Sequence, residues 1–281
     1  MLAPAKINLY LHVVGRRADG YHLLDSLIVF AEAGDVVTAR LADRISLQID
    51  GPFSAKLQAD DDNLILRAAR GLAALTGTQA GAEIRLTKNL PIASGIGGGS
   101  ADAAATLRVL TSHWRVAPER PALEQLALKL GADVPVCLDS RPSFIGGIGE
   151  EIVPAGALPA IHMLLVNPGV ATATPAVFKA RTSAFSQPAR WTAPPGDIHA
   201  LVAFLRERRN DLTDAAIIVT PVIREALNAI ERTEHCLLAR LSGSGATCFG
   251  LYATAEASQA ARDKIQAVHP AWWTVATRIA A

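Results

Sequence analysis

The chain has 281 residues, half of them hydrophobic, which is enough to bury one large core or two modest ones. Its 27 Lys and Arg residues are balanced by 26 Asp and Glu residues, so it lacks the positive surplus that holds a polyanion, and nucleic acid is excluded as a main partner. No apolar run approaches membrane-spanning length. We therefore expect a cytoplasmic globular protein with no membrane partner.

The first third of the chain is predicted to be rich in strands. Apolar and polar residues alternate from Lys6 to Val13, which predicts a half-buried strand with Lys6 and Asn8 on one face and excludes a secretion signal there. The turn residues Asp19-Gly20 precede an apolar stretch over 23–30, and residues 45–49 alternate again.

The middle of the chain is predicted to be mainly helical. Asn63 is a plausible N-cap for a helix over 64–75 that stops at Gly77. A short strand is expected over 83–87. Two further helices are expected over 101–114 and 123–130; the second is closed by Gly131 and followed by a bend that contains Asp133.

Composition shifts at 154–159, which suggests a first domain over 1–155 and a second over 156–281. A Pro-rich connection with Pro188, Pro194 and Pro195 is expected to be exposed and mobile. Strands and helices are mixed without strict βαβ alternation, so the expected fold class is α+β. The elements predicted for the second domain are strands over 162–166, 237–241, 249–253 and 273–278 and helices over 198–208, 221–232 and 256–268.

The three cysteines, Cys137, Cys236 and Cys248, are far apart and lie in apolar surroundings. Their spacing fits neither a zinc site nor a disulfide framework. Buried free thiols in a reducing compartment are the expectation.

The segment from Pro91 to Ser100 concentrates four glycines in five positions immediately before a predicted helix. Glycines let the backbone adopt positive φ and turn its N–H groups inward, while a helix N-terminus adds partial positive charge. Together they make a cradle for a di- or triphosphate, to which Ser100 could add a hydroxyl toward phosphate or a phosphate-bound Mg²⁺. The competing interpretation is a flexible turn ahead of an ordinary helix.

The common nucleotide-binding fingerprints fail here, because no Walker lysine follows the glycines, Ser100 replaces the third Rossmann glycine, and no protein-kinase triplets occur. The loop instead resembles the phosphate loop of the GHMP kinases, the family of galacto-, homoserine, mevalonate and phosphomevalonate kinases. Two more segments resemble family motifs in the expected order: Pro4-Ala5-Lys6-Ile7-Asn8 near the N-terminus and the C-terminal glycine motif with Gly243, Ser244 and Gly245. Read alone, Lys6 would be a solvated strand residue and the second glycine motif a plain turn.

Three other strings narrow the resemblance: residues 17–22, residues 130–135 and residues 174–178. They are similar to family members whose acceptor alcohol carries a cytidine diphosphate group and which act in the non-mevalonate isoprenoid route. The resemblance implies that His22 hydrogen-bonds the cytosine edge and that Tyr21 and Phe178 offer aromatic faces to the ring. Without it, Asp19-Gly20 would be only a hairpin turn and Phe178 only a core aromatic.

The same resemblance implies catalytic roles for Asp133, which would accept or orient the proton of the substrate hydroxyl, and for Lys6, which would stabilise the moving phosphoryl group. Asn8 would hold the acceptor. The competing role for Asp133 is a hydrogen bond in a turn or at a helix end. Two of the implied ATP contacts also have competing roles: Asn63 could be a helix cap, and Lys88 a solvated charge at a strand end. The implied ATP contacts are Pro91, Ser94, Gly95, Ile96, Gly97, Gly98, Gly99, Ser100, Ala101, Asn63 and Lys88.

The resemblance implies a two-lobed α+β kinase with the active-site cleft between the lobes and a ferredoxin-like C-terminal domain. ATP would be the co-substrate, with Mg²⁺ held through its phosphates, and the protein would be a monomer or weak dimer. One departure is visible: many relatives carry a second serine after Ser100, where this chain has Ala101 and then Asp102. The alternatives are a homoserine- or mevalonate-type kinase, which the phosphate loop would serve equally well, and a non-catalytic nucleotide-binding regulatory relative.

Overall fold

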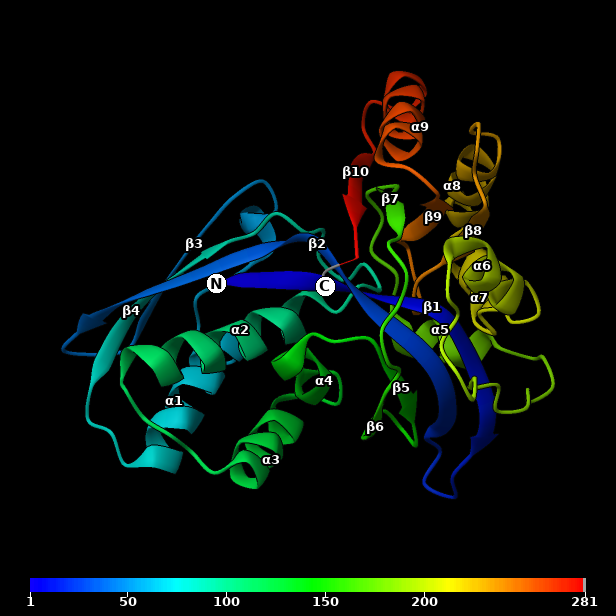
Figure 1. The fold of residues 1–281 in the computed structure, drawn as a ribbon. Coiled ribbons are helices and arrows are strands. Elements are labelled where there is room, and N and C mark those ends of the chain that lie inside the picture. Colours follow the sequence, from blue (N-terminus) through cyan, green and yellow to red (C-terminus); the bar gives the residue numbers. More distant parts are fainter. Residues whose placement is uncertain (280–281) are drawn as a thin grey trace. The chain divides into compact units, whose positions relative to one another are not determined.

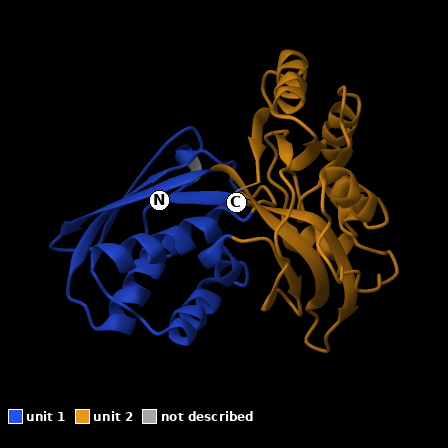
Figure 2. Cartoon of the chain, viewed as in Figure 1, with its two compact units in different colours: residues 1–5, 34–92, 97–140 blue, residues 6–33, 93–96, 141–281 orange. Residues whose placement is uncertain are grey.

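The computed structural model describes residues 1–279 and has the α+β composition expected from the sequence (Figure 1). Two long strands open the chain, β1 (Leu2–Arg16) and β2 (His22–Ala42), which pair with each other. The chain divides into two compact units, both discontinuous in sequence (Figure 2). Unit 1 comprises residues 1–5, 34–92 and 97–140, and unit 2 comprises residues 6–33, 93–96 and 141–281. This division does not coincide with the expected boundary between residues 155 and 156.

Unit 1 is a sheet with its helices on one face (Figure 1). The later part of β2 pairs with β4 in antiparallel register, and β3 pairs with β4 in parallel. Helix α1 packs on α2 and α3, and α2 packs on α4. These helices can approach α2 closely because its many alanines have small side chains. The further elements of unit 1 are β3 (Ser46–Asp50), η1 (Ser54–Lys56), α1 (Leu64–Thr76), β4 (Gly81–Thr87), α2 (Gly98–His113), α3 (Arg120–Leu130) and α4 (Val134–Asp139).

Unit 2 contains an antiparallel sheet in the order β10-β7-β9-β8, on which α8 and α9 pack. Helix α8 directly precedes β8, and α9 lies between β9 and β10. With α5, α6 and α7 inserted after β7, this is the β-α-β-β-α-β order of ferredoxin-like folds. A hairpin of β5 and β6 pairs with the early part of β2. The further elements of unit 2 are β5 (Ser143–Gly146), β6 (Glu151–Pro154), β7 (His162–Asn167), α5 (Thr174–Ala180), α6 (Ile198–Arg206), α7 (Thr213–Val219), α8 (Val222–Glu231), β8 (Leu238–Leu241), β9 (Cys248–Tyr252), α9 (Ala255–Val268) and β10 (Trp273–Arg278).

Local chemistry sets several element ends as predicted. Asn63 caps α1 by accepting a hydrogen bond from the Ile65 backbone, and Gly77 ends the helix in the left-handed conformation with φ of 68°. The Asp19-Gly20 turn between β1 and β2 is also confirmed, with Gly20 at φ of 93°.

The strand predicted over 6–13 is present, but the prediction that it is half-buried is wrong. Residues 3–13 are buried on both faces of β1, including the polar Lys6, Asn8 and His12. Polar side chains are buried only where they find partners, so a polar face buried in this way carries structural or functional contacts.

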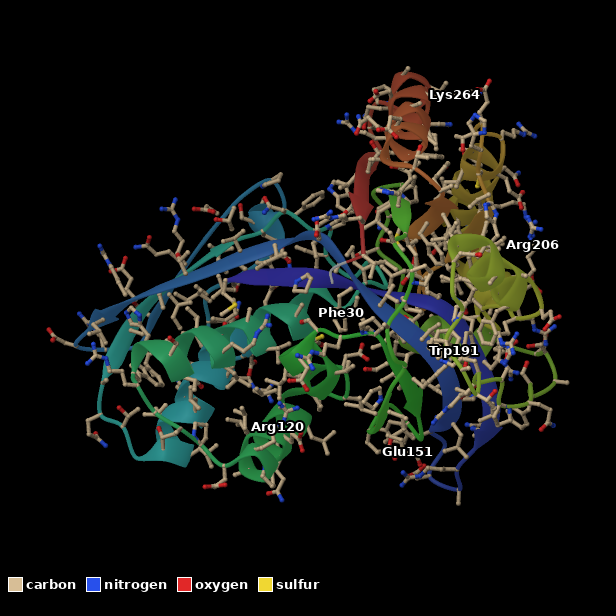
Figure 3. All side chains as sticks on the ribbon, in the orientation of Figure 1. Phe30, Arg120, Glu151, Trp191, Arg206 and Lys264 are labelled. Atoms are coloured by element: carbon tan, nitrogen blue, oxygen red, sulfur yellow. The ribbon has the colours of Figure 1, made fainter. Side chains whose placement is uncertain are left out.

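The Pro-rich connection has exposed stretches but is anchored at its centre. The Ala189 backbone and the Arg190 guanidinium both donate to the Asp25 carboxylate, at 2.8 Å each. Trp191 (labelled in Figure 3) donates to the Ala155 carbonyl and packs edge-on against Phe144. Its expected mobility stays a prediction.

None of the helices over residues 1–279 combines the length and the apolar character that crossing a bilayer requires. The three cysteines are free thiols, and Cys137 and Cys248 are buried as expected, whereas Cys236 is only partly buried.

Candidate active site

The first half of the glycine loop belongs to unit 2 and is held there by its carbonyl groups. The carbonyl oxygens of residues 93–96 each accept one hydrogen bond, and every donor lies in unit 2. In chain order the donors are the Thr172 backbone, the Thr247 backbone, the Ser242 hydroxyl and the Lys6 backbone, at 3.4, 3.0, 3.1 and 2.9 Å.

This anchoring orients the loop's donors. In a trans peptide the N–H points opposite to the carbonyl, so the N–H groups of Gly95, Ile96 and Gly97 lie on the side of their peptide planes away from these donors. Gly95 and Gly97 have φ of 76° and 64°, the positive values expected from the sequence. Glycines with positive φ allow successive backbone N–H groups to converge on one anion.

The second half of the loop is the first turn of α2, in unit 1. The helix begins at Gly98, earlier than the predicted start at Ala101, and no side chain caps its N-terminus. Its first N–H groups, at Gly98, Gly99 and Ser100, and the positive end of its dipole are by themselves suited to an anion. The two flanking positions, Pro91 and Ala101, are buried.

The C-terminal glycine motif is the turn between β8 and β9, and it packs against the start of the glycine loop within unit 2. Gly243 and Gly245 have φ of 54° and 89°. A Cβ atom placed on Gly95 would lie only 2.6 Å from the Ser242 carbonyl oxygen and 2.7 Å from the backbone of Gly245. Ser244 is buried and its hydroxyl lies 2.7 Å from that of Thr174. The two glycine motifs thus fit together because Gly95 and Gly245 bring no side chains to the contact.

Asn210 holds this turn and was given no role from the sequence. Its amide nitrogen donates to the Leu241 and Gly243 carbonyls, at 2.9 and 2.8 Å. The adjacent Asp211 accepts from the Val13 backbone in β1 at 2.7 Å. Asn210 lies about thirty residues before the motif, so no local signal could have revealed the contact; only its polar type next to Asp211 in a buried segment was visible.

Lys6 and Asn8 lie on β1 beside these loops. Lys6 is only 7% exposed, so its interpretation as a solvated strand residue is wrong. The Asn8 backbone donates to the Ser242 hydroxyl, and its side-chain nitrogen donates to the Ser26 hydroxyl at 2.8 Å. The Asn8 Oδ1 atom is buried and has no hydrogen-bond partner within residues 1–279, 3.5 Å from where a Cβ on Gly243 would stand. A buried acceptor in this state needs a donor from outside the described residues, such as a water or a ligand.

His22 and Phe178 form an aromatic pair in unit 2. Their ring centroids lie 4.9 Å apart with an interplanar angle of 26°, and Phe178 also packs against the hydrophobic core. The pKa of His22 is lowered by partial burial, and further by the positive charges of Arg16 and Arg181. Tyr21, immediately before His22, is 61% exposed. The three residues thus offer flat faces and an imidazole whose neutral form, with one donor and one acceptor, is favoured.

Asp133 lies in unit 1, directly before α4. Its side chain makes no capping hydrogen bond to that helix, so the helix-cap role is not observed. Pro135 in the first turn of α4 fixes the backbone that follows, and the Val134 backbone donates to the Gly131 carbonyl. Asp133 therefore has a defined backbone position.

Two predicted ATP contacts have structural partners in unit 1. Asn63 caps α1, as described above. Lys88 is 3% exposed, so its interpretation as a solvated strand-end charge is wrong; its ammonium group contacts Asp35 and Asp102 at 2.5 and 2.7 Å. Their contacts with ATP stay predictions.

The predicted residues are thus divided between the two units. Unit 2 brings together Lys6, Asn8, the first half of the loop and the C-terminal glycine motif, and it also carries the aromatic residues. Unit 1 carries the helical half of the loop with Asp133, Asn63 and Lys88. Among residues 1–279 no group of three or more His, Cys, Asp and Glu side chains is arranged to hold a metal.

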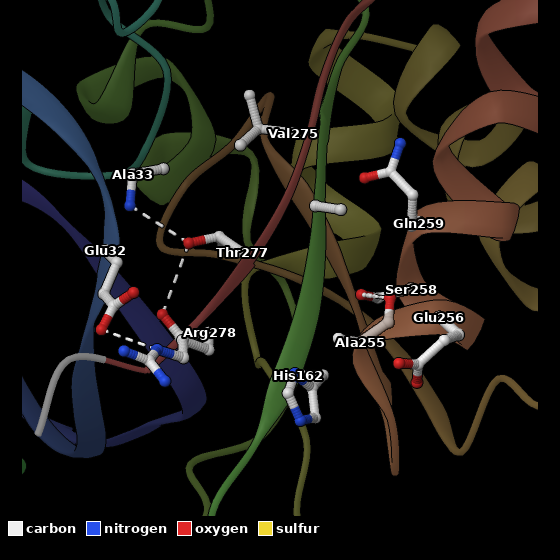
Figure 4. A pocket seen from close by; sticks show the side chains of 11 residues that line it. Glu32, Ala33, His162, Ala255, Glu256, Ser258, Gln259, Val275, Thr277 and Arg278 are labelled. Atoms are coloured by element: carbon white, nitrogen blue, oxygen red, sulfur yellow. Dashed lines mark hydrogen bonds and ion pairs between the residues drawn. The ribbon is translucent and has the colours of Figure 1, made fainter.

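A separate pocket of about 740 Å³ in unit 2 contains none of the predicted site residues (Figure 4). Some of its charged and polar groups pair with one another: Glu32 pairs with Arg278 at 2.7 Å, and the Thr277 hydroxyl accepts from the Ala33 backbone. We therefore place the candidate active site at the residues singled out from the sequence, beside the glycine loop and the C-terminal glycine motif, where Asn8 has a buried acceptor that is unpaired within residues 1–279.

Comparison with known proteins defines the class. Residues 63–141 match the model of the GHMP kinases N terminal domain, and residues 195–271 match that of the GHMP kinases C terminal domain. The chain belongs to the GHMP kinase family, the ATP-dependent kinases of small molecules. This confirms the resemblance inferred from the glycine loop, the N-terminal segment with Lys6 and the C-terminal glycine motif.

Particular members of that family are similar over nearly the whole chain. The 4-diphosphocytidyl-2-C-methyl-D-erythritol kinase of Paramagnetospirillum magneticum is 55% identical over 271 residues, which cover 96% of this chain and 95% of the relative. A crystal structure of 4-(cytidine 5'-diphospho)-2C-methyl-D-erythritol kinase superposes with a TM-score of 0.81 at 29% identity, covering 100% of this chain and 99% of the other. A homoserine kinase from Cytophaga hutchinsonii shares the fold, with a TM-score of 0.73 at 16% identity over 98% of this chain and 93% of the other.

Proposed function

We propose that this protein transfers the γ-phosphoryl group of ATP to the 2-hydroxyl of 4-diphosphocytidyl-2-C-methyl-D-erythritol, giving the 2-phosphate and ADP in the non-mevalonate isoprenoid route. The observation that carries the choice of acceptor is the His22–Phe178 pair beside the exposed Tyr21. An acceptor with a cytosine ring uses such aromatic faces, whereas homoserine and mevalonate have no ring to stack. The names of the relatives at 55% and 29% identity agree with this choice.

His22 suits the cytosine edge because that edge presents one acceptor nitrogen and one amino donor. The lowered pKa of His22 favours the neutral imidazole, in which one nitrogen donates and the other accepts, so either a donor or an acceptor can face the cytosine edge. A protonated imidazole would lose the acceptor. Asn8 is proposed to accept a hydrogen bond from the acceptor molecule through its buried Oδ1 atom.

The chemistry is proposed to depend on charge and position. The row of backbone N–H groups from Gly95 into α2 would hold the ATP phosphates, and Lys6 would offset the negative charge of the moving phosphoryl group. Asp133 would accept or orient the proton of the 2-hydroxyl as the new P–O bond forms and the bond to ADP breaks. Mg²⁺ would be bound mainly by the ATP phosphates, with the Ser100 hydroxyl as a protein ligand, and would lower the charge of the phosphates.

A panel of acceptors tests the proposal. Purified protein is supplied with ATP and Mg²⁺, and ADP release is followed in the presence of the cytidine-diphosphate-tagged methylerythritol, homoserine or mevalonate. We expect turnover only with the tagged alcohol. Turnover of homoserine or mevalonate instead would reassign the acceptor, and ATP binding without any turnover would favour a non-catalytic regulatory relative.

A further inference from the structure

We propose that Asp35, Lys88 and Asp102 form a buried clamp that holds the two flanks of the glycine loop at the spacing required by the ATP phosphates. Lys88 is then a positioning residue, whose ammonium group lies against the first residue of α2. The inference rests on the proposed use of this loop for ATP. All three residues belong to unit 1, and each is at most 3% exposed.

Asp35 fixes the segment that leads into the loop. Its Oδ1 atom accepts from the backbone N–H groups of Asn89 and Leu90, at 2.6 and 2.8 Å. Its Oδ2 atom accepts from the Lys88 ammonium at 2.5 Å. The Asp35 carboxylate thus accepts three hydrogen bonds from three consecutive residues, 88–90. These charge-assisted bonds fix the position of this flank relative to β2.

Lys88 connects this flank to the helix that follows the loop. Its ammonium also donates to Asp102 Oδ2 at 2.7 Å, and Asp102 lies one turn into α2. The loop between Lys88 and Asp102 is therefore closed at its base by a single side chain. Any change in the distance between the two flanks must break an ion pair inside the protein.

The ammonium group also lies directly against the start of α2. A Cβ atom on Gly98, the first residue of the helix, would stand 3.1 Å from Lys88 Nζ and 3.6 Å from Asp35 Oδ2. A cation at a helix N-terminus is unfavourable by itself, so the two carboxylates are needed to keep it there. Because the two carboxylates offset its charge, Lys88 contributes a fixed position and no net positive charge at the helix start.

Stability alone does not account for the cluster. Burying three charged groups costs about as much as their attraction returns, and apolar replacements of similar volume are often as stable. Burial and the nearby Asp35 carboxylate raise the pKa of Asp102, although the Lys88 charge opposes the shift. A second carboxylate anion beside Asp35 is therefore unfavourable in this buried position. What the cluster provides is a defined geometry at both ends of the phosphate loop.

The test compares variants of the full chain in their affinity for Mg²⁺ and a non-hydrolysable ATP analogue, measured by calorimetry. Asp102→Leu removes the link between Lys88 and α2 but leaves Lys88 paired with Asp35. We expect about tenfold weaker binding of the analogue, with the KM for the acceptor unchanged within about twofold. Asp102→Asn keeps an acceptor for Lys88 and should bind within about threefold of the wild type.

Trp114→Phe is the matched control for stability. It removes the hydrogen bond from Trp114 Nε1 to the Gly81 carbonyl, just beyond the other end of α2, far along the helix from the loop. We expect it to lower Tm without changing analogue affinity. If Asp102→Leu does not accumulate as folded protein, Asp102→Thr takes its place.

The proposal is overturned if Asp102→Leu lowers Tm but binds the analogue as tightly as the wild type, or if Trp114→Phe weakens binding as much as Asp102→Leu does. Because the analogue binds without an acceptor, the clamp is tested even if the wild type ignores the cytidine-tagged alcohol. A wild type that fails to bind the analogue would overturn the use of ATP and the clamp together.

Discussion

The two ends of the glycine loop are held by different means. In unit 2 the loop is fixed by neutral hydrogen bonds to its carbonyls and by backbone packed against Gly95. In unit 1 it is fixed by buried ions, and Gly98 faces the end of the Lys88 side chain. At 3.1 Å a new Cβ on Gly98 would displace the Lys88 ammonium by only a few tenths of an ångström, whereas at Gly95 it would overlap packed backbone. The unit 2 end should therefore be the less tolerant of change.

The largest expected effect concerns the chemistry that unit 1 supplies. Asp133→Asn keeps the size of the side chain but removes its charge, so we expect kcat to fall by about 10²- to 10⁴-fold. The affinity for the ATP analogue should stay near that of the wild type, because the loop is untouched. Pre-steady-state and steady-state rates of ADP formation measure the change, and near-normal turnover would remove Asp133 from the mechanism.

Gly95→Ala tests the comparison of the loop's ends most directly. The new Cβ would meet the Ser242 carbonyl oxygen at 2.6 Å in a backbone with φ of 76°, so we expect a loss of about 3 kcal/mol or more in the free energy of unfolding. Gly98→Ala is the matched control, and since its Cβ meets only a side-chain end we expect a loss of about 1 kcal/mol or less. Urea unfolding measures both losses. Equal losses would contradict the distinction between the two ends of the loop.

Phe178→Ala tests whether unit 2 recognises a ring. Removing one aromatic face should raise the KM for the cytidine-tagged acceptor by about three- to tenfold, since an aromatic pair contributes about 0.5–1.5 kcal/mol beyond its buried area. The KM for ATP should not change. If both KM values rise together, the effect comes from the loss of core packing by Phe178 and not from the acceptor.

The smallest expected effect is a change in the pKa of His22. The Arg181 charge lowers this pKa, so Arg181→Met should raise it toward the ordinary value of 6.5, as measured by NMR titration of the imidazole. In the wild type the KM for the acceptor should be flat above pH 6.5 and rise at lower pH as His22 gains a proton. The variant should show this rise at a higher pH. An unchanged titration would mean that Arg181 does not face His22.

Much of the fold could be predicted because local sequence determines it. The caps Asn63 and Gly77 define α1, and period-two alternation identifies β1 and β3. The hairpin of β5 and β6 was missed because each strand has four residues, too few to show a period. The burial of the polar face of β1 depends on contacts with residues such as Ser242, more than two hundred positions away.

The candidate site was predictable where a motif requires a backbone geometry. Positive φ at Gly95, Gly97 and Gly243 follows from the density of glycines. The cluster around Lys88 could not be predicted, because Asp35 and Asp102 lie 53 and 14 residues away and a lysine at a strand end is normally solvated. The hydrogen bond from Asn210 to the backbone at the C-terminal glycine motif could not be predicted either, because it also joins residues far apart in the sequence.

The central claim is that a nucleotide-tagged alcohol receives the phosphoryl group, and ³¹P NMR of the reaction tests it most directly. With ATP, Mg²⁺ and 4-diphosphocytidyl-2-C-methyl-D-erythritol, we predict a new phosphomonoester resonance that grows as ADP forms, while the cytidine diphosphate signals remain. The same spectra with homoserine or mevalonate should show ATP unchanged. A monoester formed only from homoserine or mevalonate, or loss of the cytidine diphosphate signals, would contradict the account.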